Sequence, residues 1–269
     1  MGDQDEPYPV DLTTPNVARM YDYYLGGKDN FASDRDAADK ALEIAPQIRL
    51  AAQQNRAFMG RAVRHLAESG IRQFLDIGTG LPTQSNVHEV AQEAADGTRV
   101  VYVDNDPVVL AHGRAILGGT ESVHIVQADL RHPEEILDNA EVKEHLDFTK
   151  PIAVLLVAIV HFLQDHDDPE TIVARMRSAL PSGGYLVLSH VCGEAQPGAV
   201  PGVTEIYRHS STPIVARSPE RIRGFFGDLE ILDPGIVNVA QWRPDSVEGK
   251  RIAEKYQRPY FLAGVARKP

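Results

Sequence analysis

The chain has 269 residues, of which 43% are hydrophobic and 24% charged, which suits one sizeable soluble domain or one domain with a cap. The formal net charge of −11 argues against a nucleic-acid-binding surface, which would be basic. A single cysteine, Cys192, excludes a disulfide framework and a cysteine-ligated zinc site. No apolar run approaches the roughly 20 residues of a membrane span, and the acidic N-terminus lacks a signal-peptide core. We expect a cytoplasmic protein without a membrane partner.

The first 70 residues are predicted to form a flexible tail, residues 1–13, and a helical cap, residues 14–70. Thr14 and the proline after it are typical of a helix start. A double glycine is expected to end this helix, and Ser33 is a candidate N-cap for the next one. A third helix is expected at residues 47–68, where apolar residues recur at helical spacing.

The segment YDYYLGGKDNF, residues 21–31, places three tyrosines beside a double glycine, a lysine and two acids. Two interpretations remain open for this segment. It is either a packed part of the cap or a lid that closes over a ligand. Tyr21 is therefore a candidate cofactor contact, and Tyr24 a candidate catalytic residue that faces the ligand.

From residue 71 onward, strand-like and helix-like segments alternate. Repeated units of this kind predict a mostly parallel sheet with helices on both faces, the α/β Rossmann-like class, for residues 71–269. Strands are expected at residues 73–77, 99–104, 123–129, 151–160 and 185–190.

Two later segments depart from this alternation. A loop-rich insertion, residues 191–217, leaves the carboxyl end of the fifth strand, the edge at which such sheets bind ligands. We therefore expect it on the substrate side. Residues 229–242 and 258–269 are strand-like runs with no crossover helix expected between them. They predict an antiparallel last strand at the end of the sheet.

A glycine turn and three acids at strand ends predict a nucleoside site. The turn at Gly78 and Gly80 follows the first strand and lets the backbone approach a ligand. Asp76, inside that strand, is placed to bind an ammonium group. Asp104 ends the second strand and is placed to accept hydrogen bonds from ribose hydroxyls, while Asp129 ends the third, where an adenine edge would lie. A single such Asp is more often a turn former, but three at one edge favour a site.

The motifs around these acids select the nucleotide. Thr83 replaces the third glycine of a dinucleotide fingerprint, and no P-loop lysine motif is present. FLDIGTG, VDNDP and QADLRHP instead resemble the first motif, the ribose segment and the adenine segment of the class I S-adenosylmethionine (SAM)-dependent methyltransferases. The resemblance implies SAM as the cofactor. The cofactor-binding residues it implies are Asp76, Gly78, Thr79, Gly80, Asp104, Asn105, Asp129, Leu130, Ala158 and Tyr21.

A closer resemblance spans nearly the whole chain. ARMYDYYLGGKDNF, QNRAFMGRAVRHLA, GIRQFLDIGTGLPT and AVLLVAIVHFL together are similar to a bacterial family of S-adenosyl methyltransferases first catalogued as a domain of unknown function. Pro82 departs from the general class, where a third glycine is common, and a proline is compatible with the first position of a helix. The helix-like run VHEVAQEAA, residues 87–95, follows it.

A general base would help methyl transfer to a hydroxyl or a protonated amine. His161, just past the fourth strand, is the candidate, and His190, at the end of the fifth, is a second; a structural hydrogen-bonding role is the simpler interpretation of either. The histidines and acids of HFLQDHDDPE, which include His166, are more simply a loop leading into a helix than a metal site. We therefore predict no metal.

The predicted function is transfer of the SAM methyl group to a small-molecule acceptor, and no oligomeric state is predicted. The main alternative is a non-catalytic SAM- or nucleoside-binding or interaction protein that keeps the fold, because fold alone does not establish activity. Aminopropyl transfer has faint support in the acidic segment around Asp165. A nicotinamide dehydrogenase is disfavoured by the missing third glycine.

Overall fold

The structure, a computed structural model, describes residues 11–82, 85–117, 120–194, 198–255 and 260–269. Most of the expected N-terminal tail lies outside these ranges. A central sheet crosses the molecule in the order β3-β2-β1-β4-β5-β8-β6, with β7 paired to β8. Strands β1 to β5 are parallel and β8 is antiparallel to β5, as predicted. The strands are β1 (Gln73–Ile77), β2 (Arg99–Asp104), β3 (Val123–Gln127), β4 (Ala153–Val157), β5 (Tyr185–Val191), β6 (Glu230–Ile231), β7 (Val237–Asn238) and β8 (Phe261–Arg267).

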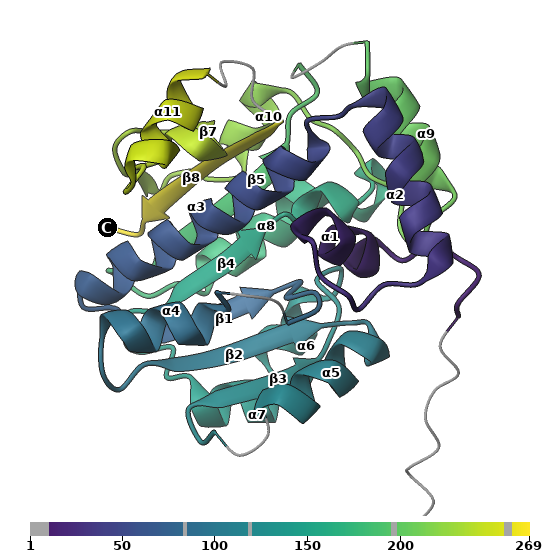
Figure 1. Ribbon diagram of the computed structural model, residues 1–269. Coiled ribbons are helices and arrows are strands. Elements are labelled where there is room, and N and C mark those ends of the chain that lie inside the picture. The colour runs from purple at the N-terminus through teal and green to yellow at the C-terminus, as the bar shows by residue number, and fades with distance from the viewer. Residues whose placement is uncertain (1–10, 83–84, 118–119, 195–197, 256–259) are drawn as a thin grey trace, which may run out of the picture.

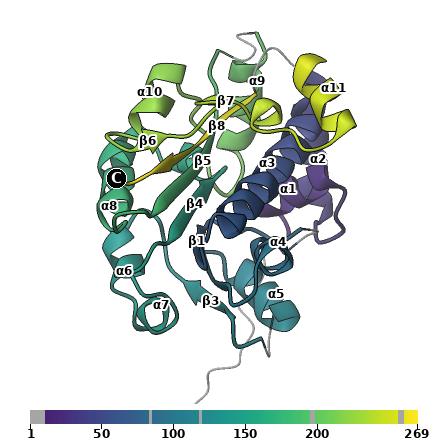
Figure 2. The same ribbon diagram turned by 90° about the vertical axis from the view of Figure 1, so that its left-hand side faces the viewer.

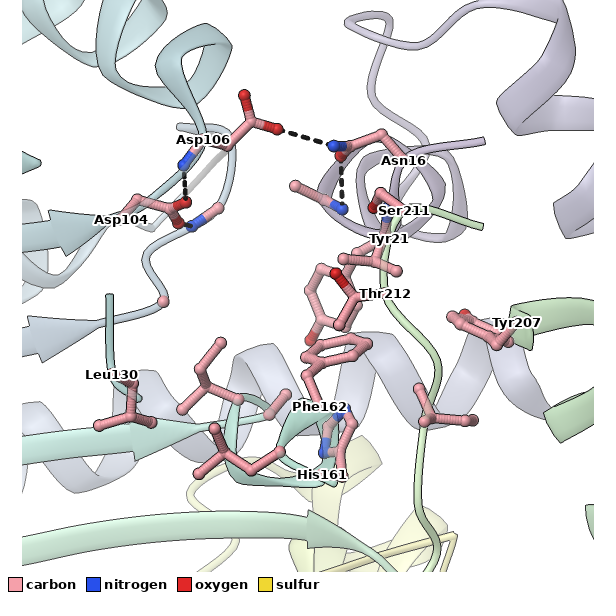
Figure 3. A pocket seen from close by; sticks show the side chains of 18 of the residues that line it. Asn16, Tyr21, Asp104, Asp106, Leu130, His161, Phe162, Tyr207, Ser211 and Thr212 are labelled. Carbon is pink, nitrogen blue, oxygen red and sulfur yellow. Dashed lines mark hydrogen bonds between the residues drawn. The ribbon is translucent and has the colours of Figure 1, made fainter. Parts of the chain in front are cut away.

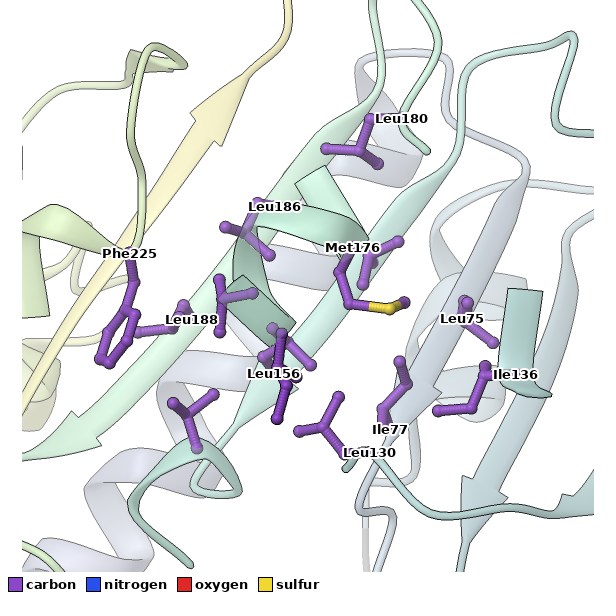
Figure 4. Close-up of a cluster of buried hydrophobic side chains, with 14 of the residues drawn as sticks. Leu75, Ile77, Leu130, Ile136, Leu156, Met176, Leu180, Leu186, Leu188 and Phe225 are labelled. Atoms are coloured by element: carbon purple, nitrogen blue, oxygen red, sulfur yellow. The ribbon is translucent and has the colours of Figure 1, made fainter. Parts of the chain in front are cut away.

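Helices cover both faces of this sheet, which gives the predicted α/β architecture (Figures 1 and 2). In β1 the side chains alternate, so Phe74 packs on one face while Leu75 and Ile77 pack on the other. The first face is covered by α3 (Ile48–Glu68), α4 (Val87–Ala94) and α5 (Pro107–Leu117), and the second by α6 (Pro133–Leu137), α7 (Ala140–His145), α8 (Pro169–Ser178) and α10 (Pro219–Gly224). Figure 4 shows the core of the second face, where Leu156 and Met176 are fully buried.

A third apolar cluster holds the N-terminal helices on the rest of the molecule. It joins α1 (Val17–Leu25), α2 (Ala32–Ile44), the first part of α3 and α9 (Val200–Arg208). Asn16, rather than Thr14, caps α1 by accepting hydrogen bonds from two backbone N–H groups. Helix α2 begins before the expected cap Ser33, because the Asp34 carboxylate accepts the Phe31 N–H at 2.8 Å. In contrast to α1 and α2, most of α3 lies directly on the sheet.

One other expectation was wrong. Helix α11 (Val247–Lys255) separates β7 from β8, where no helix was expected; it has no buried side chain. The helix expected at residues 87–95 is α4, with Asn86 as its cap, so Pro82 lies ahead of its first turn. The segment after β4 forms the short helices η1 (Val160–Phe162) and η2 (Asp165–Asp167), and η3 (Val239–Gln241) follows β7. Among the described helices, none is long and apolar enough to cross a membrane.

The turn between α1 and α2 is built around the buried side chain of Asp22. Its carboxylate accepts hydrogen bonds from the Asp29 N–H at 3.0 Å and from Asn30 Nδ2 at 2.8 Å. A Cβ atom at Gly27 would overlap this carboxylate. The unusual YDYYLGGKDNF segment is therefore organised, in part, by a packed acid that leaves room only for glycine.

We predict that Gly27→Ala destabilises the protein by about 1–3 kcal/mol, because the Asp22 carboxylate must move and lose its partners. Gly60→Ala is the matched control, since a Cβ at Gly60, inside α3, meets only open space; alanine there should be neutral or stabilising by up to about 1 kcal/mol. Urea unfolding measures both changes. Equal effects of the two substitutions would contradict the role assigned to Asp22.

Candidate functional site

A cavity of about 840 Å³ lies at the carboxyl ends of β1, β2 and β4 and is closed by α1 and α9 (Figure 3). This is the edge at which open α/β sheets bind ligands. The ten predicted cofactor residues and the two first catalytic candidates, Tyr24 and His161, line it; the cofactor residues are Tyr21, Asp76, Gly78, Thr79, Gly80, Asp104, Asn105, Asp129, Leu130 and Ala158.

The glycine turn after β1 is fixed by its neighbours. Gly78 has a φ of +73° and donates its N–H to the Val103 carbonyl at 2.8 Å, and a Cβ at this position would meet the Ile159 side chain at 2.5 Å. Gly80 donates its N–H to Asp104 Oδ2 at 2.9 Å. Only a residue without a side chain suits Gly78, since both its backbone conformation and its surroundings exclude a Cβ.

Asp104 ties the end of β2 to this turn. Its Oδ1 accepts the N–H of Asp106 at 2.9 Å, while its Oδ2 holds Gly80. Burial raises the pKa of Asp104 to about 6, although these backbone hydrogen bonds oppose the rise. Each carboxylate oxygen can accept a second hydrogen bond, so the group still offers acceptors to a ligand.

Asp76 is the buried acid of the site, with 6% of its surface exposed. Burial raises its pKa to about 7; the positive charge of Arg56 opposes this shift and the negative charge of Asp104 adds to it. Among the described residues, none donates a hydrogen bond to the Asp76 carboxylate. A buried anion without such a partner is well placed to bind a cationic group of a ligand.

The residues that follow β3 are polar, and Asp129 and Arg131 form an ion pair there. Asp129 accepts hydrogen bonds from Arg131 and from Asn105 Nδ2, the latter at 2.9 Å. Burial raises the pKa of Asp129, but the hydrogen bonds from Arg131 and Asn105 outweigh that effect and the pKa falls to about 2. Asp129 therefore stays ionised, with Leu130 beside it as an apolar wall of the cavity.

At the end of β4, Ala158 adopts a left-handed conformation with a φ of +57°. Its N–H donates to the Ser189 side-chain oxygen at 3.0 Å, which joins β4 to β5. A non-glycine residue in this conformation is uncommon and is held there by its surroundings. The bend sends the chain into η1, which carries His161 to the cavity wall.

His161 is 4% exposed, and its ring lies 4.5 Å from that of Phe162. Burial holds the pKa of His161 far below its ordinary value, with further contributions from His190 and Arg217. The imidazole is therefore neutral near pH 7, and its Nδ1 has no hydrogen-bond partner within the described ranges.

The second candidate base, His190, is outside the cavity lining and has a structural role. Its Nδ1 lies 2.8 Å from the Val191 carbonyl and its Nε2 lies 3.1 Å from Arg217. Arg217 is fully buried and also donates to the Val160 and Leu163 carbonyls, so this pair holds η1 in place. Over the described parts of the chain, no group of histidines, cysteines and acids could hold a metal ion.

Two of the three tyrosines of α1, Tyr21 and Tyr24, line the cavity on the side of the cap. The Tyr21 hydroxyl donates to the Ala52 carbonyl at 3.1 Å and accepts from Asn55 at 3.0 Å. The Tyr24 hydroxyl accepts from Tyr207 of α9 at 3.3 Å, and burial raises the pKa of Tyr24. Both side chains are thus held by the protein itself.

Sequence reasoning missed several residues of the lining. Asn16 links the cap to the β2 edge, because its Nδ2 donates to Asp106 Oδ2 at 2.7 Å (Figure 3). Arg56 reaches the cavity from α3, close enough to influence Asp76. These residues belong to no recognisable sequence motif, because each of them interacts with a residue that is distant in the sequence.

The strand order, the antiparallel β8 and the glycine turn with its strand-end acids define a class I methyltransferase. The family model described as S-adenosyl methyltransferase matches residues 3–269, and the chain belongs to this family. SAM is accordingly its cofactor and methyl donor. A comparison with curated proteins found no match.

Solved structures agree with this assignment. A DUF574 family protein from Streptomyces avermitilis is 43% identical, with a TM-score of 0.91 over 96% of this chain and 99% of that one. A protein from Thermobifida fusca assigned as a methyltransferase is 41% identical, with a TM-score of 0.89 over 98% of this chain and 99% of that one. A SAM-dependent methyltransferase from Mesorhizobium loti, 19% identical, shares the fold with a TM-score of 0.52 over 77% of this chain and 96% of that one.

The raised pKa of Asp76 predicts an effect on stability in the absence of ligand. The folded protein keeps this proton up to about pH 7, whereas the unfolded chain releases it near the ordinary value of 3.8, so the contribution of Asp76 to stability falls as the pH rises between these values. Asp76→Asn removes the titration. Between pH 5 and pH 8, the free energy of unfolding of the variant should therefore rise by about 2 kcal/mol relative to that of the natural protein.

Denaturant unfolding at the two pH values measures this change. Asp96→Asn, at an exposed position outside the cavity, is the control and should track the natural protein at both. If the difference in the free energy of unfolding between Asp76→Asn and the natural protein is the same at pH 5 and pH 8, Asp76 is ionised over this whole range.

Proposed function

We propose that the chain transfers the methyl group of SAM to a small molecule bound in the same cavity, in the cytoplasm. The observation that carries the proposal is the continuity of the cavity, which reaches from the glycine turn and Asp76 to the region bounded by His161, Tyr24 and Tyr207. Its volume falls within the range of ~300–1,000 Å³ common for small-molecule sites. The acidic net charge of −11 further disfavours a nucleic-acid acceptor.

The residues at the β1 and β2 ends fit the donor. We assign the SAM ammonium group to Asp76, whose carboxylate is buried and lacks a hydrogen bond from the described residues. Asp104 would accept hydrogen bonds from the ribose hydroxyls, while Asn105, Asp129 and Leu130 would surround the adenine. Bound SAM supplies a methyl group activated by its positively charged sulfur.

The other wall of the cavity supports acceptor chemistry. Alignment of the reacting groups and exclusion of water can supply much of the acceleration. His161 is neutral near pH 7 and is our candidate for the group that takes the acceptor proton. Tyr24 keeps its own proton because burial raises its pKa, so we assign it a hydrogen-bonding role in the wall.

Calorimetric titration tests the donor site. We expect SAM and its product S-adenosylhomocysteine to bind with micromolar affinity, about −8 kcal/mol, and NAD not to bind. Asp104→Asn should weaken SAM binding about 10- to 100-fold, because hydrogen bonds to a charged group are worth about 1.5–3 kcal/mol. Asp96→Asn should leave the affinity unchanged.

Two outcomes of this titration would count against the assignment. Full SAM affinity in the folded Asp104→Asn variant would rule out the ribose contact. Absence of binding by both SAM and S-adenosylhomocysteine would favour the non-catalytic interaction protein.

We predict that His161→Gln lowers the rate of methyl transfer by about 100-fold or more, the usual minimum for a lost general base, and leaves S-adenosylhomocysteine affinity unchanged. A methyl-release assay with an acceptor from a compound screen measures the rate, and calorimetry measures the affinity. His209→Gln, at an exposed position beyond α9, is the control. A parallel loss of affinity and rate in His161→Gln would assign His161 a structural role.

A further inference from the structure

The end of the cavity away from the glycine turn is lined mainly by aromatic and aliphatic side chains. In Figure 3 Tyr207 lies on the far side of the cavity from Asp104, with His161 and Phe162 between them. We call this end the acceptor compartment. It is bounded by aromatic and aliphatic side chains: Tyr24, Val203, Tyr207, Tyr260, Phe261 and Phe162.

The hydroxyl groups of the compartment are neutral. Tyr207 donates to Tyr24 at 3.3 Å, and burial raises the pKa of both Tyr207 and Tyr260 to about 12. These side chains therefore offer aromatic surface and uncharged hydrogen-bonding groups. Such walls favour a flat apolar ligand, because aromatic rings gain from stacked and edge-to-face contacts.

Three elements of the compartment, η1, α9 and residues 211–216, contribute no carboxylate, ammonium or guanidinium group to its lining. The Asp167 carboxylate of η2 lines the same cavity, but its Oδ2 accepts the Gln164 N–H at 2.7 Å and its Oδ1 lies 3.6 Å from His166 Nε2. On the α1 side, Arg19 is paired with Asp34 at 2.7 Å and Asp22 is held by Asn30. The positive charge of Arg56 acts on Asp76, at the donor end. Among the described residues, a charged acceptor would thus find no unpaired opposite charge at this end, and burial of an unpaired charge is unfavourable.

Resting on the function proposed above, we propose that the methyl acceptor is an uncharged aromatic hydroxy compound that is methylated on oxygen. An alkyl amine would arrive as a cation and a carboxylic acid as an anion, and the described residues of the compartment offer neither of them an unpaired counter-charge. A phenolic hydroxyl is neutral at pH 7 and matches the tyrosine-lined wall.

The transfer balances with the groups at hand. The acceptor oxygen forms a bond to the methyl carbon as the bond from that carbon to sulfur breaks. The sulfur keeps the electron pair and becomes a neutral thioether. The hydroxyl proton passes to the imidazole of His161 and then to solvent, and no oxidant or further reactant is required.

Three probes with the same ring system test the proposal: naphthol, naphthoate and naphthylmethylammonium, each titrated at pH 7 into protein saturated with S-adenosylhomocysteine. We expect naphthol to bind at least tenfold more tightly than either ion. Equal or tighter binding of an ion, or no binding of naphthol to the loaded protein, would overturn the inference and leave the proposed function intact. If S-adenosylhomocysteine itself does not bind, both this inference and the proposed function are contradicted.

A carboxylate placed in the compartment should reverse this preference. Val203→Asp is expected to weaken naphthol binding at least tenfold and to strengthen binding of naphthylmethylammonium, with S-adenosylhomocysteine affinity unchanged. Val247→Asp, at a position 88% exposed on α11, is the matched control and should alter nothing. If Val203→Asp does not fold, Thr204→Asp, at a half-buried lining position, repeats the test. An unchanged order of affinities in a folded variant would place the acceptor elsewhere.

Discussion

The hydrogen bond from the Gly80 backbone to Asp104 is the interaction on which the donor end of the cavity depends. It joins the turn after β1 to the end of β2, and the second oxygen of the same carboxylate holds the start of the segment that leads into α5. Desolvation of this half-buried carboxyl group raises its pKa, yet the group organises two backbone segments at once. The backbone hydrogen bonds that it accepts offset part of the cost of its desolvation and fix the shape of this end of the cavity.

The sheet was predictable because its central strands are buried on both faces. The bounds of β1 and β2 agree with the sequence prediction, since continuous apolar runs mark them clearly. Helix α11 was missed because its sequence is largely charged and contains Gly249, and it buries no side chain in the core. Strands β6 and β7 are too short to show alternation.

The parts of the candidate site that lie within sequence motifs were predictable, and the other parts were not. The acids and glycines near β1, β2 and β3 were found because strand ends of a parallel sheet meet at one edge. Asn16 and Arg56 were not, because the residues they act on lie on other elements and no motif in the neighbouring sequence indicates such contacts. Long-range side-chain contacts of this kind become visible only in the folded molecule.

The contact between Gly78 and Ile159 has a consequence for how the protein can diversify. The donor turn touches the segment that carries His161, so these two parts cannot shift independently. The acceptor compartment, in contrast, takes much of its wall from α9 and residues 211–216, which lie outside the repeating strand–helix units. Under the function proposed above, substitutions in that wall would change which compound is accepted without moving the glycine turn or His161.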